Sequence, residues 1–208
     1  MPNERGLSPR TAALVAGFGL LTMTLCAPFA FFKLIPASIN SDDMAATIAS
    51  LQTNPTPYLI ALVLLFTTYV MDIVVAWGLY WLLRADQPAL SLLTAWLRLI
   101  YTCLAFIGLF ASVEVYELAT ATEFANSAAQ ESLLQAKLLG ANAMTNTALM
   151  FFGVHLLVLG LALWRSTLVP LWAGVAVVLA GISYITQEMV SYINPDLDLG
   201  WLLLLALG

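Results

Sequence analysis

Residues 58–83 have the sequence YLIALVLLFTTYVMDIVVAWGLYWLL, residues 84–88 RADQP, and residues 89–112 ALSLLTAWLRLIYTCLAFIGLFAS. Each of the two long runs is apolar and exceeds the roughly 20 residues that an α-helix needs to cross a bilayer. The short connection, which ends in a proline, allows only a tight turn, so the two helices should pack side by side and antiparallel. The sequence therefore predicts a transmembrane helical hairpin.

Each helix of this hairpin carries one charged residue, Asp72 in the first and Arg98 in the second. Counted from the turn, both are about 10–14 residues in, or roughly 15–20 Å along a helix, so their depths nearly match. Ionisable side chains are costly in hydrocarbon and usually face the interior of a bundle, where they find a partner. We therefore expect Asp72 and Arg98 to pair and the other helices to pack around the hairpin.

The composition is that of a membrane protein. The chain has 208 residues, of which 62% are hydrophobic and 9% are charged, whereas a soluble domain has about 25% charged residues. The seven Lys and Arg residues are scattered along a chain of net charge −5, which does not favour binding to nucleic acid. The length suits one transmembrane domain over residues 1–208.

Apolar runs and helix-start signals predict an all-α polytopic membrane helix bundle of six helices with a short last helix. The expected spans are about 11–32, 58–83, 89–112, 140–164, 167–187 and 195–208. Amphipathic surface helices are expected in the outer loops. Ser41 is the expected N-cap of one helix from Asp42 to about Gln52, and Thr120-x-x-Glu123 has the form of a capping box for a second.

The basic residues predict the orientation. With a cytoplasmic N-terminus, every short basic loop falls on the cytoplasmic side, through Arg5, Arg10, Arg84 and Arg165. The positive-inside rule favours this arrangement. We therefore expect a multi-pass protein of the bacterial cytoplasmic (inner) membrane, embedded in the lipid bilayer.

The single histidine, His155, also lies inside a predicted span. It is about nine residues before the inner end of its helix, roughly 14 Å, which is close to the depth of Asp72 and Arg98. Tyr69 and Tyr101 are each about one turn from a charged residue and could add hydroxyl groups. These five residues could form a ligand or proton site, or a structural clasp in which Asp72 and Arg98 lock the hairpin with His155 nearby. A fixed arginine beside Asp72 favours the clasp over a proton relay.

Motifs for catalysis or metal binding are missing from the sequence. One histidine, with no second His or Cys at helical spacing, does not make a usual transition-metal site. There is also no phosphate loop, G-x-S-x-G or H-E-x-x-H. We therefore name no catalytic residue, no metal ligand and no cofactor.

Several segments resemble those of a known family. They are residues 8–10 (SPR), 69–73 (YVMDI), 97–101 (LRLIY), 151–156 (FFGVHL) and 164–170 (WRSTLVP), in this order. Together they resemble an uncharacterised bacterial membrane family catalogued as domain of unknown function 4386, over nearly the whole chain. The resemblance implies a six-helix inner-membrane protein of about this size, and it implies no activity. The short last span departs from the family pattern.

Three functions are considered. We favour a non-enzymatic accessory or lipid- or small-molecule-binding subunit, which docks on a membrane-protein partner, forms a homo-oligomer or holds a lipid-like ligand. The alternative is a small proton-linked transporter that works through Asp72, Arg98 and His155, and an intramembrane enzyme is third. The accessory role predicts copurification with a partner, whereas a transporter needs a polar cavity that reaches the level of Asp72.

Overall fold

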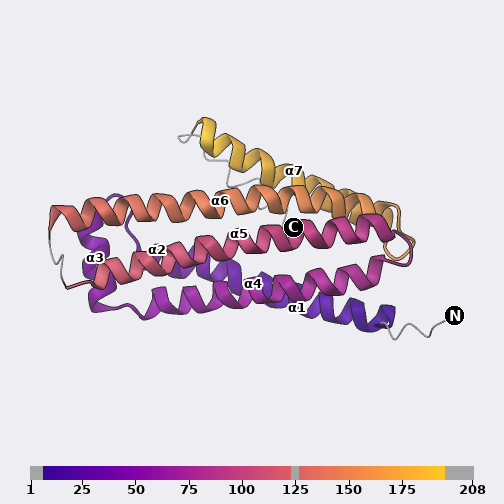
Figure 1. The fold of residues 1–208 in the computed structure, drawn as a ribbon, viewed down its shortest axis with the longest axis horizontal. Helices are drawn as coiled ribbons and strands as arrows, with labels where there is room; N and C mark the ends of the chain where they lie inside the picture. Colours follow the sequence, from indigo (N-terminus) through magenta and orange to yellow (C-terminus); the bar gives the residue numbers. More distant parts are fainter. Residues whose placement is uncertain (1–6, 123–126, 195–208) are drawn as a thin grey trace. The chain divides into compact units, whose positions relative to one another are not determined.

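The computed structural model describes residues 7–122 and 127–194, and Figure 1 traces its helices along the sequence. All regular structure in these ranges is helical, which confirms the all-α class. The elements are α1 (Pro9–Phe29), a π-helical turn η1 (Ala30–Leu34), α2 (Ile35–Ser38), α3 (Met44–Thr53), α4 (Thr56–Leu83), α5 (Pro88–Thr120), α6 (Ala128–Trp164) and α7 (Leu171–Ile193).

Within residues 7–122 and 127–194, five helical segments are long and apolar enough to cross a membrane, so the chain is a multi-span membrane protein. They are the run Pro9–Ser38, which joins α1, η1 and α2, and the four helices α4, α5, α6 and α7. Each corresponds to one of the first five expected spans. The expected sixth span, residues 195–208, lies outside the described residues.

The first span contains a π-helical turn that the sequence analysis did not anticipate. In this turn the Ile35 N–H donates to the Ala30 carbonyl, five residues earlier. Pro36 follows directly and has no N–H to donate, so the carbonyl one turn before it loses its α-helical partner. A wider turn at this place lets the helix continue through the proline into α2.

The surface helix α3 confirms one of the two expected amphipathic helices, although its N-cap is different. The cap is Asp43, whose Oδ1 accepts a hydrogen bond from the Ala46 N–H at 2.8 Å, and not Ser41. The buried face of α3 includes Met44, Ile48 and Leu51, and these three residues recur at helical spacing.

The capping box expected for a second surface helix includes Glu123, which lies outside the described residues. Within them, α5 ends at Thr120, whose hydroxyl donates to the Tyr116 carbonyl at 2.9 Å. The next helix, α6, begins at Ala128 after Ser127, whose Oγ accepts from the Gln130 N–H at 3.1 Å. Ser127-x-x-Gln130 therefore has the capping-box spacing that the sequence analysis overlooked.

The described chain forms two compact units. Unit 1 comprises Met1–Leu20, Asp72–Cys103 and Asn146–Gly208, and unit 2 comprises Leu21–Met71 and Leu104–Thr145. In unit 2 the Tyr58 hydroxyl of α4 donates to the Ser112 carbonyl of α5 at 2.9 Å. The Gln52 side chain donates to the Ala119 carbonyl at 2.9 Å. This bond gives a partner to one of the last carbonyls of α5, which have no N–H of the following turn to accept from.

In unit 1, α4 and α5 pack together and their turn is tied to the turn between α6 and α7. Next to the α4–α5 turn, the Ser91 hydroxyl donates to the Tyr80 carbonyl at 2.8 Å. Asp86, within that turn, accepts from the Ser166 hydroxyl at 3.0 Å. These bonds hold the ends of four helices together on the side where the three arginines Arg10, Arg84 and Arg165 lie near helix ends.

Glycines bring the backbones of α6 and α7 into direct contact in unit 1. A Cβ atom at Gly160 would lie 2.8 Å from the Gly174 carbonyl oxygen, and one at Gly181 would lie 2.8 Å from the Gly153 carbonyl oxygen. The two pairs fix the register of α7 along α6, because only glycine leaves room for such an approach.

We expect Gly160→Ala to destabilise the protein by about 1–3 kcal/mol, the usual cost of overpacking a well-packed contact. The Cβ would collide with the backbone of α7, which cannot move aside like a flexible side chain. Thermal unfolding in detergent measures the effect.

The matched control is Gly140→Ala on the same helix, where an added Cβ meets no atom within 4 Å. This substitution should be neutral or stabilising by up to about 1 kcal/mol, because alanine favours the helix. Equal melting temperatures for the two variants would contradict the close contact between α6 and α7.

Candidate functional site

Three polar side chains from three helices meet inside unit 1. The Arg98 Nη2 of α5 lies 2.6 Å from the Asp72 Oδ1 of α4. The Arg98 Nη1 lies 3.1 Å from the His155 Nε2 of α6. Exposed fractions of 0%, 1% and 0% for Asp72, Arg98 and His155 show that the group is fully enclosed. We call these three residues the buried cluster.

The contacts of His155 fix its protonation state and its tautomer. An arginine guanidinium can only donate hydrogen bonds, so the His155 Nε2 must accept from Arg98. The other ring nitrogen, Nδ1, lies 3.0 Å from the Thr94 carbonyl oxygen, which can only accept. His155 is therefore neutral, with its hydrogen on Nδ1, and it uses both ring nitrogens within the protein.

Helical spacing explains how the sequence brings these groups together. Thr94, Arg98 and Tyr101 are separated by four and three residues on α5, so they share one face of this helix. The Thr94 carbonyl holds His155, Arg98 lies at the centre, and the side chain of Tyr101 is the other polar group that acts on Asp72. One face of α5 therefore organises the whole buried cluster.

An aromatic residue that the sequence analysis did not name as part of the site covers the buried cluster. The Phe152 ring stacks on the His155 ring with 5.7 Å between centroids and lies 5.6 Å from the Arg98 Cζ. The Phe152 ring also packs against the Tyr101 ring, with 4.8 Å between their centroids. Its position three residues before His155 was the available signal, since that spacing places both rings on one face of α6.

Tyr69 and Tyr101 have different surroundings in the structure. Tyr101 is 6% exposed and belongs to the surroundings of the buried cluster in unit 1. Tyr69 belongs to unit 2, where its ring meets the Phe106 ring edge-on at 5.5 Å. A role for Tyr69 beside Asp72 stays a prediction.

The Thr94 hydroxyl beside the buried cluster and the Asp72 Oδ2 within it are buried and have no hydrogen-bond partner among the described residues, while the Asp72 Oδ1 is held by its ion pair with Arg98. In the same ranges, no group of three or more His, Cys, Asp or Glu residues could hold a metal ion.

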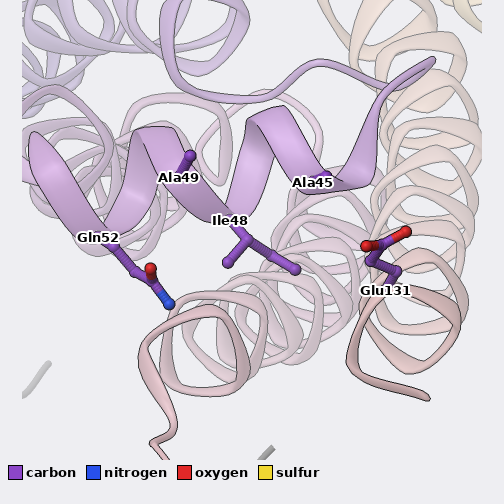
Figure 2. Close-up of a pocket in the computed structure, with 5 residues that line it drawn as sticks. All are labelled: Ala45, Ile48, Ala49, Gln52 and Glu131. Carbon is purple, nitrogen blue, oxygen red and sulfur yellow. The ribbon is translucent and has the colours of Figure 1, made fainter. Parts of the chain in front are cut away.

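A second candidate site is a partly open hollow of about 230 Å³ in unit 2, shown in Figure 2. Ala45, Ile48, Ala49 and Gln52 of α3 line one side, and Glu131 in the first turn of α6 lines the other. In Figure 2 the Ile48 and Gln52 side chains extend from α3, and the Glu131 carboxylate faces the beginning of that helix. The amide of Gln52 is already bound to the Ala119 carbonyl, so the hollow offers mainly methyl groups and one carboxylate.

The fold and the buried cluster together define a multi-span membrane protein with an ion pair, Asp72–Arg98, buried inside unit 1. Residues 15–208 match the model of a family described as "Domain of unknown function (DUF4386)", and the chain belongs to this family. The resemblance inferred from the sequence is thereby confirmed. A similar protein of Archaeoglobus fulgidus, named "Uncharacterized protein", is 25% identical over 155 residues, which is 74% of this chain and 80% of the relative. No solved structure matches the chain.

We expect Asp72→Asn and Arg98→Gln each to destabilise the protein by about 3–5 kcal/mol, since each single change leaves a buried charge without its partner. The double variant should recover much of this loss, because it removes both charges together. Unfolding of the four proteins in detergent gives the coupling free energy.

The control cycle uses Glu114 and Lys137, which form an ion pair of 2.8 Å with exposed fractions of 34% and 42%. Removing one partner of such an accessible pair should cost at most about 1 kcal/mol. A coupling energy for Asp72 and Arg98 as small as that of the control pair would show that the buried cluster does not stabilise the fold.

Proposed function

We propose that this protein is a non-enzymatic membrane subunit, which docks on a membrane-protein partner or holds a lipid-like molecule, and that the buried cluster is its structural clasp. The observation that carries this proposal is the closure of the cluster. Arg98 binds Asp72 and His155 at the same time, and the second ring nitrogen of His155, Nδ1, donates a hydrogen bond to the Thr94 carbonyl. Each side chain of the cluster is thus already bound to another group of the protein.

Full enclosure argues against transport through the buried cluster. A proton-linked transporter would have to bring water or substrate to Asp72, and that requires Arg98 to release one of its two partners. Breaking a buried ion pair without replacement leaves an uncompensated charge in hydrocarbon, at a cost of several kcal/mol. The transporter alternative therefore needs a second conformation, whereas the clasp needs only the contacts described.

The helix surfaces support binding within the bilayer. Large apolar side chains of the peripheral helices are turned outward, with exposed fractions of 69% for Phe18 on α1 and 72% for Trp172 on α7. Lipid chains, a second copy or a partner helix can cover such surfaces. The role proposed for this chain therefore lies on its outside, and the buried cluster keeps the helices in place.

We also propose a location in the cytoplasmic membrane with the N-terminus on the cytoplasmic side. Its support is the common end of unit 1, where Arg10 lies in the first turn of α1, Arg84 follows α4 and Arg165 follows α6. A reporter fused after Arg165 should be active in the cytoplasm, and activity on the far side would overturn this orientation.

Native mass spectrometry after gentle extraction at native expression tests the proposed function. We expect the wild-type chain to retain a partner subunit or a bound lipid-like molecule. His155→Ala should lower the melting temperature without changing what is bound, because a clasp stabilises the fold and does not contact the ligand.

Two results would contradict the proposal. One is a lone monomer with nothing bound, obtained in a detergent that preserves the complexes of other membrane proteins in the same extract. The other is loss of the bound molecule in His155→Ala at an unchanged melting temperature, since this would make His155 a ligand contact.

A further inference from the structure

A second buried charged residue lies apart from the buried cluster, near the end of α7. Glu188 is 3% exposed and precedes the last residue of that helix by only five positions. Tyr184, one turn earlier on α7, is close enough to Glu188 for the two side chains to interact electrostatically. A carboxylate buried inside a membrane-spanning segment is costly and often indicates function.

No basic residue neutralises Glu188 within residues 7–122 and 127–194. No hydrogen bond or ion pair in these ranges reaches its carboxylate. The Ser191 hydroxyl donates to the backbone carbonyl of Glu188 at 2.8 Å and not to its side chain. The basic groups of other buried or paired sites are already used, Arg98 by Asp72 and Lys137 by Glu114. The residues that follow Glu188 in the sequence include no Lys, Arg or His.

A buried polar atom is also present at the neighbouring residue. The Gln187 Oε1 is buried and has no hydrogen-bond donor among the described residues. Buried acceptors of this kind are rare in proteins and are satisfied by a water molecule or an ion. Tyr184 precedes Glu188 by four residues and shares its face of α7, and carboxylate and hydroxyl oxygens are ligands that hard cations take.

The position of Glu188 is held by the backbone contact between α6 and α7. Gly181, seven residues before Glu188, lies against Gly153, and Gly174 lies against Gly160. Because seven residues are close to two helical turns, Glu188 lies on the same face of α7 as these glycines. Rotation of α7 to bring the carboxylate out of the interior would separate both glycine pairs.

We propose that Glu188 binds a monovalent cation supplied from outside the chain, either a proton or Na⁺. The positive charge compensates the buried carboxylate, and the Tyr184 hydroxyl is a neutral oxygen on the same face of α7. This site is separate from the clasp, and it adds an ion-binding role to the subunit proposed above.

Aromatic contacts connect this site with the buried cluster in unit 1. The Tyr184 ring meets the Phe152 ring edge-on at 5.2 Å, and Phe152 stacks on His155 at 5.7 Å. Phe152 thus separates the two groups of charges.

Labelling with dicyclohexylcarbodiimide tests the proposal in the full chain, in membranes or mild detergent. This apolar reagent reacts with protonated carboxyl groups, and peptide mass spectrometry locates the product. If a proton is the ligand, labelling of Glu188 should fall by up to about tenfold per pH unit as the acid ionises. If Na⁺ is the ligand, NaCl should suppress the labelling at constant pH, and choline chloride should not.

Controls are present in the same digest. Glu117 is exposed to solvent and Asp72 is bound to Arg98, so both should stay at background, and Glu188→Gln should abolish the product at position 188. The proposal is overturned if Glu188 of the wild type is labelled no more than Glu117 at every pH and salt condition. It is also overturned if its labelling responds neither to pH nor to Na⁺.

Discussion

The position of Arg98 between Asp72 and His155 is the constraint on which unit 1 depends. A guanidinium group cannot lose its proton in a protein, so once α5 is in the membrane its charge must be compensated inside the bundle. Asp72 supplies the charge at 2.6 Å, and His155 accepts the second hydrogen bond at 3.1 Å. Neither α4 nor α6 can slide or rotate against α5 without exposing this charge to hydrocarbon, so one residue fixes three helices.

The fourth helix of unit 1 is held by a different kind of interaction. Two glycine pairs, Gly153 with Gly181 and Gly160 with Gly174, bring the backbone of α7 against that of α6. In a bilayer the hydrophobic effect does not drive helices together, so close packing and polar contacts must do so. The buried cluster therefore holds α4, α5 and α6 together, and the glycine contacts hold α7 against α6. The Phe152 ring connects these two sets of contacts, because it packs against both His155 and Tyr184.

The sequence was most informative where the membrane restricts the choices. One acid and one base in adjacent apolar helices have few partners other than each other, and counting residues from the turn was enough to match their depths. Rotation about the helix axes could not be obtained this way, so the sequence could not show that the Tyr101 ring packs against Phe152 at the buried cluster, and the role of Tyr69 stays a prediction. Apolar runs likewise show where a helix leaves the bilayer and not where it ends, which is why the start of α6 at Ala128 was missed. Glu188 is visible in the sequence as an acid near the end of an apolar run, but its burial, which distinguishes it from an acid at the membrane interface, is seen only in the structure.

Nitrogen NMR of the imidazole ring tests the central claim most directly, because His155 is the single histidine of the chain and its signals need no assignment. The account predicts a neutral ring at neutral pH with the hydrogen on Nδ1, where it donates to Thr94, and a bare Nε2 that accepts from Arg98. Arg98→Gln should change the Nε2 signal most. A hydrogen on Nε2, or on both nitrogens, would contradict the clasp, because His155 could not then accept from the arginine.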